Sequence, residues 1–97
     1  MRPKPIGIVG GAGPQAGLLL SNRIFKLSAS LYRCQRDSDF PQVTLLSYPF
    51  TEMLTEAVEE KKIEDELRLV LSLLKQTGSE IFAIACNTLH AFLPDEA

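Results

Sequence analysis

The sequence has no strong excess of charge of either sign. Its 10 basic and 12 acidic residues give a formal net charge of −2 over 97 residues. Proteins that bind nucleic acids or membrane surfaces usually present a clear basic excess, so this balance gives no electrostatic reason for either partner. We therefore predict that the chain binds neither a nucleic acid nor a membrane.

Long apolar runs are lacking as well. Glycines and a proline interrupt the first apolar stretch, residues 6–14, a few residues after a basic start. This pattern matches neither a secretory signal peptide nor a membrane-spanning helix, so the sequence predicts a cytoplasmic protein. Only two cysteines are present, and in an intracellular chain we expect both to be free thiols.

What the sequence does contain is an alternation of strand-like and helix-like segments. Apolar residues at helical spacing predict one helix over residues 14–33. A second apolar stripe changes phase at Glu59–Lys62, which predicts a short helix, a charged break and then a crossover helix over residues 63–76. The predicted strands are Ile6–Val9, Val43–Ser47 and Ile81–Ala85.

This order of elements predicts a single α/β lobe over residues 1–97, with parallel strands joined by right-handed crossovers. The strands are almost fully apolar, which indicates a three-layer arrangement with helices on both faces of the sheet. We expect the strand order 2-1-3, which places the third strand at an edge. An apolar edge strand is a template for pairing with another chain, so we also expect a homodimer.

Ligands of open α/β sheets bind beyond the carboxyl ends of the strands. Three loops leave those ends, at residues 10–15, 47–51 and 86–90, so Cys86 lies where chemistry is expected. A free cysteine is also one of the most commonly buried residues, and that alternative stays open for Cys86. Cys34 follows a helix that runs back to the opposite edge, and we expect no chemical role for it.

The first of these loops resembles a dinucleotide-binding loop, because Gly11, Gly13 and Ala16 follow the spacing G-x-G-x-x-A. Such a site also needs an acidic residue at the end of the second strand, where Ser47 and Tyr48 stand instead. A phosphate-binding loop would need a Gly-Lys-Ser/Thr run, which is lacking. We favour a simpler interpretation, in which glycine amides at the start of a helix bind a substrate carboxylate.

Three segments together resemble a known family: "IGIVGGAGPQAG" at the start, "RDSDFP" before the second strand and "ACNTLH" after the third. In this order and spacing they resemble the pyridoxal-independent aspartate/glutamate racemases, especially the aspartate racemase branch. Members of that family have two related α/β lobes, each donating a cysteine. The resemblance implies that this chain is the N-terminal lobe, a truncated half of a two-lobed racemase fold.

The resemblance also implies an activity and the residues that carry it. It predicts an amino-acid racemase that uses no cofactor and no metal, with an amino acid or related carboxylate as substrate. Cys86 is implied as the catalytic acid or base of this lobe. His90 is implied either in a supporting chemical role or as a residue that orients the loop. The implied substrate-binding residues are Gly11, Ala12, Gly13, Ser47, Asn87 and Thr88.

Departures from the family pattern leave the substrate open. Ala12 replaces the usual methionine, and the loop after the second strand has no arginine before Arg68, whereas many aspartate racemases have one that can bind a carboxylate. A side chain less acidic than that of aspartate is therefore an alternative. Two other functions also stay open: a single-cysteine isomerase or decarboxylase of small carboxylic acids, and a non-catalytic lobe that only binds small acids or self-associates.

Overall fold

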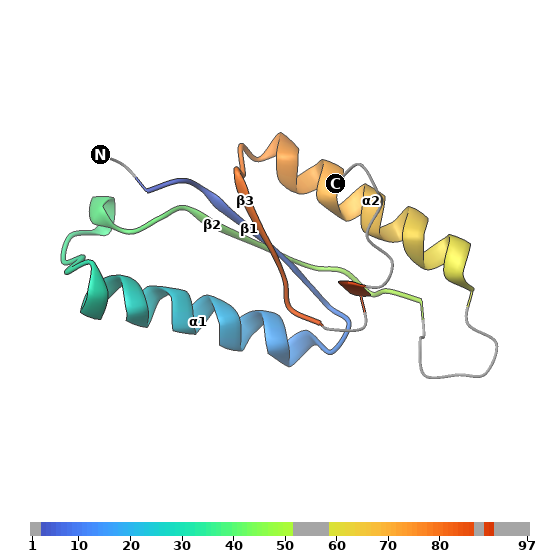
Figure 1. The fold of residues 1–97 in the computed structure, drawn as a ribbon, viewed down its shortest axis with the longest axis horizontal. Coiled ribbons are helices and arrows are strands. Elements are labelled where there is room, and N and C mark those ends of the chain that lie inside the picture. Colours follow the sequence, from blue (N-terminus) through green and yellow to red (C-terminus); the bar gives the residue numbers. More distant parts are fainter. Residues whose placement is uncertain (1–2, 52–58, 87–88, 91–97) are drawn as a thin grey trace.

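The computed structural model describes residues 3–51, 59–86 and 89–90 (Figure 1). Two helices, α1 (Pro14–Leu31) and α2 (Glu60–Gln76), lie on opposite faces of one sheet. The strands run parallel in the order β2-β1-β3, so the predicted three-layer α/β lobe with strand order 2-1-3 is confirmed. Its strands are β1 (Ile6–Gly10), β2 (Val43–Ser47) and β3 (Ile81–Ile84).

The central strand β1 packs against both helices. Ile8 and Val9 are fully buried, and because side chains alternate along a strand they point to opposite faces of the sheet. Val9 belongs to the core on the α2 side. On the other side, α1 lies so close to the sheet that a Cβ atom added to Gly17 would come within 2.8 Å of the Leu45 side chain. The missing side chain of Gly17 therefore permits the close packing of α1.

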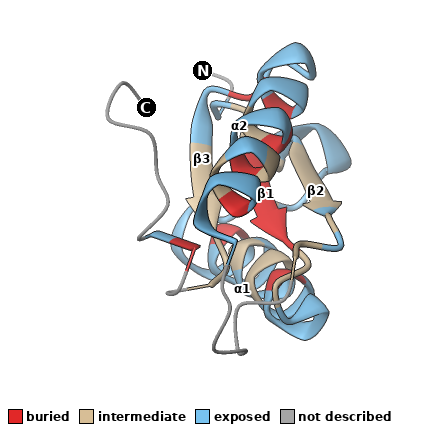
Figure 2. Cartoon of the chain, turned by 90° about the vertical axis from the view of Figure 1, so that its right-hand side faces the viewer, coloured by how far each residue is buried: buried red, intermediate tan, exposed pale blue. Residues whose placement is uncertain are grey.

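The larger core lies between the sheet and α2. The buried residues of α2 recur every three or four positions and form one apolar stripe that faces the sheet, which Figure 2 shows as the red inner side of the helix. Burying one such side chain contributes about 1.5–3 kcal/mol to stability. The fully buried members of this core cluster are Val9, Ile63, Leu67, Val70, Leu74 and Leu89.

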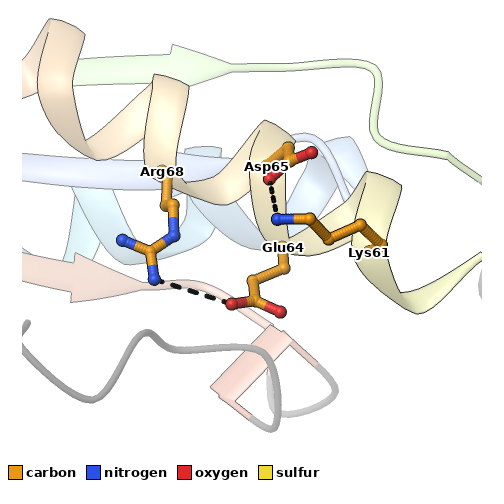
Figure 3. Close-up of polar contacts among 4 residues, drawn as sticks. All are labelled: Lys61, Glu64, Asp65 and Arg68. Atoms are coloured by element: carbon orange, nitrogen blue, oxygen red, sulfur yellow. Dashed lines mark hydrogen bonds and ion pairs between the residues drawn. The ribbon is translucent and has the colours of Figure 1, made fainter.

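The start of α2 differs from the sequence prediction. The charged run Glu59–Lys62 was expected to interrupt the helix, but α2 already begins at Glu60. Glutamate and lysine favour helix, and exposed ion pairs one turn apart add a few tenths of a kcal/mol each. Two such pairs follow one another along α2, Lys61–Asp65 at 2.9 Å and Glu64–Arg68 at 3.6 Å (Figure 3). The short helix predicted before this point falls on residues 52–58, outside the described residues.

Coverage of the sheet by helices is incomplete at β3. Helix α1 packs on β1 and β2, and Ile81 at the start of β3 is 47% exposed. A helix is about 10 Å wide and strands are about 4.8 Å apart, so one helix covers roughly two strands. Both faces of β1 are thus covered by helices as predicted, and β3, at the predicted edge of the sheet, is only partly covered. Beside α1 an open groove of about 950 Å³ is lined by Ile6, Ile24, Leu27, Ser28 and Ile81, among others.

The segment "RDSDFP" forms a tight turn before β2. Helix α1 ends at Leu31, two residues earlier than predicted, and Asp37–Asp39 then form a short 3-10 helix. The Asp39 carboxylate accepts hydrogen bonds from the backbone N–H groups of Gln35, at 3.1 Å, and Arg36, at 3.0 Å. The turn precedes β2, so it lies at the amino ends of the strands and away from the predicted site.

These hydrogen bonds predict a pH dependence. The backbone N–H group of Arg36, and then that of Gln35, lowers the pKa of Asp39 from its ordinary value of 3.8. A pKa that is lower in the folded state means that the ionised turn stabilises the fold above the unfolded-state pKa, and that this contribution is lost as the pH falls through the folded-state value. Titration of the Asp39 carboxyl carbon by NMR should therefore give a midpoint below 3.8. A midpoint at or above that of the same group in a peptide of residues 34–41 would contradict this.

Candidate functional site

The predicted site loops meet at the carboxyl edge of the sheet. Gly10 pairs in register with Ser47, and Val9 pairs with Ile84, so β1, β2 and β3 end side by side. Beyond these ends, the N–H group of Tyr48 donates to the carbonyl oxygen of Gly10 at 3.1 Å. The N–H group of Ala85 donates to the carbonyl oxygen of Val9 at 2.9 Å, which carries β3 toward Cys86 at the same edge.

The glycine loop lies directly against the loop that follows β2. Gly11 has a φ of 102°, and a Cβ atom there would collide with the backbone of Tyr48. Gly13 also has a positive φ, of 80°, but a Cβ atom there would meet nothing within 4 Å. Gly11 is thus required by both conformation and space, whereas Gly13 is required by conformation alone. Ala12, between them, is partly buried against the core cluster.

The loop after β2 forms a wall of this edge. The rings of Tyr48 and Phe50 pack edge to face, with centroids 5.1 Å apart, and both contact the core cluster. The N–H group of Thr51 donates to the Glu66 carboxylate of α2 at 3.1 Å. Ser47, a predicted substrate-binding residue, is exposed at the end of β2. An exposed hydroxyl group at this edge is available to a ligand.

Cys86 lies between the core and the exposed edge. It is half-buried as a free thiol and contacts the core cluster. Leu89 is fully buried in that cluster and so anchors the chain that follows Cys86, whereas His90 is exposed. The predicted substrate-binding residues Asn87 and Thr88 lie outside the described residues. The thiol is therefore neither sealed in the core nor free of contacts with it.

The second cysteine lies at the other end of the sheet. Cys34 lines the groove beside α1, near Lys4 and the start of β3, and its thiol donates to the Asp39 carbonyl oxygen at 3.3 Å. The structure therefore does not bring the two cysteines together. Within the described part of the chain, no three potential ligands among histidine, cysteine, aspartate and glutamate are grouped as a metal site. The helices described there include none with the length and hydropathy needed to cross a membrane.

Two contributors to this edge were not singled out from the sequence. Glu66 belongs to α2, and no local pattern marks it as a partner of a residue 15 positions earlier. In the sequence, Tyr48 stands where a dinucleotide-binding site would need an acidic residue, and nothing there marks it as a contact of Gly11. Its backbone contact with Gly11 depends on the pairing of β1 with β2, which residue spacing alone does not reveal.

Comparison with known proteins supports the family resemblance. No protein-family model matches the sequence. The chain is 24% identical over 87 residues to the broad specificity amino-acid racemase RacX of Bacillus subtilis (strain 168), a match that covers 90% of this chain and 38% of RacX. This chain is similar to the amino-acid racemases. The resemblance predicted from the three sequence segments is thereby confirmed.

A solved structure confirms the fold. PH1733, an aspartate racemase homologue from Pyrococcus horikoshii OT3, matches with a TM-score of 0.71 and 21% sequence identity, over 94% of this chain and 42% of PH1733. The shared fold therefore extends over nearly all of the chain. The chain spans less than half the length of either relative.

The contact between Gly11 and Tyr48 predicts unequal effects of two alanine substitutions. Gly11→Ala adds a collision with the Tyr48 backbone to the strain of a positive φ, so it should lower the free energy of unfolding by about 2 kcal/mol or more. The matched control Gly13→Ala has the strain without the collision and should cost about 1 kcal/mol. Urea denaturation measures both values. Equal losses would mean that the glycine loop does not depend on this close approach.

Proposed function

We propose that this chain supplies one of the two cysteines of a cofactor-independent amino-acid racemase, with Cys86 as the catalytic thiol. The observation that carries the proposal is the position of Cys86, half-buried at the carboxyl edge of the sheet that the glycine loop also borders. Its support from known proteins is the similarity to RacX and to PH1733. The proposed substrate is aspartate or a related acidic amino acid.

The proposed chemistry is proton transfer at the α-carbon. The Cys86 thiolate takes the α-proton, and the electrons of the broken C–H bond pass to the α-carbon and the adjoining carboxylate. A thiol on the opposite face then returns a proton with inverted configuration, or Cys86 itself acts as that acid in the reverse direction. The negative charge of the intermediate must be stabilised by hydrogen-bond donors placed beside the carboxylate.

The donors we propose belong to the loops at this edge. The backbone of Gly11, Ala12 and Gly13 precedes α1, where amide groups favour an anion. Ser47 adds an exposed hydroxyl group. Asn87 and Thr88 follow Cys86 in the sequence and are proposed as further donors, and His90 is proposed to support the thiol. In this arrangement the carboxylate is bound by the glycine loop while the α-carbon faces Cys86.

Cys34 of the same chain cannot supply the second acid/base group, because it lies at the other end of the sheet. We therefore propose that residues 1–97 correspond to one lobe of a two-lobed site. The matches to RacX and PH1733 cover 38% and 42% of those chains, which agrees with one lobe of two. Full racemisation then requires a partner lobe or a second copy of the chain.

A broader substrate range is the second candidate. The loop after β2 contains no arginine, and Arg68 is on α2, where it pairs with Glu64 at 3.6 Å. RacX, to which the chain is similar, is named for broad specificity. Amino acids with side chains less acidic than aspartate are therefore the comparison substrates for any assay.

The proposed role of Cys86 predicts exchange of the substrate α-proton without net racemisation by the monomer. In deuterium oxide, proton NMR of L-aspartate should show slow loss of the α-proton signal with the wild-type chain. With Ile81→Lys, which we expect to be monomeric, the loss should occur without inversion. Cys86→Ser should abolish the loss, because serine is a far weaker base at neutral pH, whereas the control Cys34→Ser should retain it. Exchange that survives Cys86→Ser, its absence from the wild-type chain, or inversion of aspartate by the monomer would each contradict the proposal.

We also propose that the chain forms a homodimer through β3 and the helix flank beside it. Ile81 is 47% exposed on β3, which is an edge strand of the sheet within the described residues, and Leu27 of α1, which lines the same groove, is 37% exposed. An apolar strand edge next to an exposed leucine favours pairing with another copy.

Light scattering after size exclusion tests this proposal. The wild-type chain should elute as a dimer, and Ile81→Lys should shift it to a monomer, since a charge on an edge strand opposes pairing. The control Leu19→Lys changes a residue that is 68% exposed and does not line the groove, so it should stay dimeric. A wild-type monomer at high concentration, or equal behaviour of the two variants, would disprove the predicted interface.

A further inference from the structure

Glu66 differs from its acidic neighbours on α2. Asp65 pairs with Lys61 at 2.9 Å, and Glu64 pairs with Arg68 at 3.6 Å, both on the surface of the helix (Figure 3). The carboxylate of Glu66 instead accepts a hydrogen bond at 3.1 Å from the backbone N–H group of Thr51, in a partly buried position. This contact therefore joins α2 to the loop that follows β2.

The geometry of α2 explains why Glu66 reaches that loop. Ile63 and Leu67, on either side of it, are fully buried against the sheet, so Glu66 lies at the margin of the buried stripe. A hydrogen bond from an N–H group to an ionised carboxylate is stronger than one between neutral groups. Glu66 can thus hold Thr51, which pairs with no strand within the described residues.

The two ends of the loop are held by different contacts. At one end, the Tyr48 N–H group donates to the Gly10 carbonyl oxygen at 3.1 Å. At the other, Thr51 is held by Glu66. Between them, the rings of Tyr48 and Phe50 pack on the core cluster that Cys86 also contacts. A change at Glu66 can therefore reach the surroundings of Cys86 through this wall of packed rings.

We infer that Glu66 is a positioning residue that holds the loop Ser47–Thr51 against the core and so sets the surroundings of the Cys86 thiol. The consequence for substrate rests on the proposed racemase function, because Ser47 and Cys86 belong to that site. The positioning itself does not depend on that function, since it follows from the contacts of Thr51, Tyr48 and Phe50.

The test compares three substitutions on a Cys34→Ser background, in which Cys86 is the only thiol. Glu66→Ala removes the acceptor, Glu66→Gln keeps an oxygen acceptor without the charge, and Glu64→Ala is the control on the same helix. Hydrogen exchange by NMR should be roughly tenfold faster at the Thr51 amide in Glu66→Ala. It should stay within about threefold of the parent in Glu66→Gln and unchanged in Glu64→Ala.

The second measurement is alkylation of Cys86 by iodoacetamide. Its rate should change severalfold in Glu66→Ala and return to near the parent value in Glu66→Gln, because the restored acceptor again holds the loop. If Glu66 only stabilised the helix, Glu66→Ala and Glu64→Ala would change the alkylation rate of Cys86 to the same extent. Equal rates in those two variants, or failure of Glu66→Gln to restore the parent rate, would overturn the inference.

Thr51→Pro removes the N–H donor from the loop side and keeps the inference testable if Glu66→Ala does not fold. It should reproduce the change in the alkylation rate, and an unchanged rate would count against the inference. Failure of the proposed function has a separate signature. If the parent chain exchanges no α-proton of aspartate while Glu66→Ala still alters Thr51 exchange and Cys86 alkylation, the positioning role holds and the racemase proposal fails.

Discussion

The parallel pairing of β1 with both of its neighbours is the constraint on which the site depends. Because β2 and β3 pair in register along β1, their carboxyl ends reach the same edge. The glycine loop, Tyr48 and Cys86 follow those ends and therefore gather there, although they are separated by tens of residues in the sequence. The same pairing places Cys34 and the turn around Asp39 at the opposite edge. The parallel pairing thus separates the end of the sheet that carries the candidate site from the end that carries Cys34 and the Asp39 turn.

Close backbone approach then shapes that edge. Gly17 lets α1 approach the Leu45 side chain, and Gly11 lets the first loop lie against the backbone of Tyr48. Any side chain at Gly11 would push the two loops apart, and the positive φ adds to the strain. The glycine spacing after β1 resembles a nucleotide-binding loop, but in the structure Gly11 permits close contact between two segments of backbone.

The buried core packs against several residues of the candidate site. Leu89 is buried together with Ile63, Leu67 and Val9, and it ties the chain after Cys86 to the same cluster that carries Tyr48 and Phe50. Cys86 therefore packs against the core and does not lie on an isolated loop. In contrast, the flank of α1 beside β3 is open, since one helix covers only about two strands. The lobe is tightly packed on its α2 side and incompletely covered on the other.

The sequence by itself determined the order of elements, the parallel sheet with strand order 2-1-3, the racemase resemblance and the position of Cys86 after the third strand. Local periodicity and segments of specific spacing carry that information, so it can be read without a structure. The charged break predicted at Glu59–Lys62 was wrong, because helix propensity and ion pairs one turn apart let α2 begin at Glu60. Only the tertiary structure decided that Gly11 touches Tyr48 and that the Glu66 carboxylate accepts a hydrogen bond from Thr51. The physical reason is that each of these features depends on how helices and loops distant in sequence pack on the sheet, which no local pattern of residues specifies.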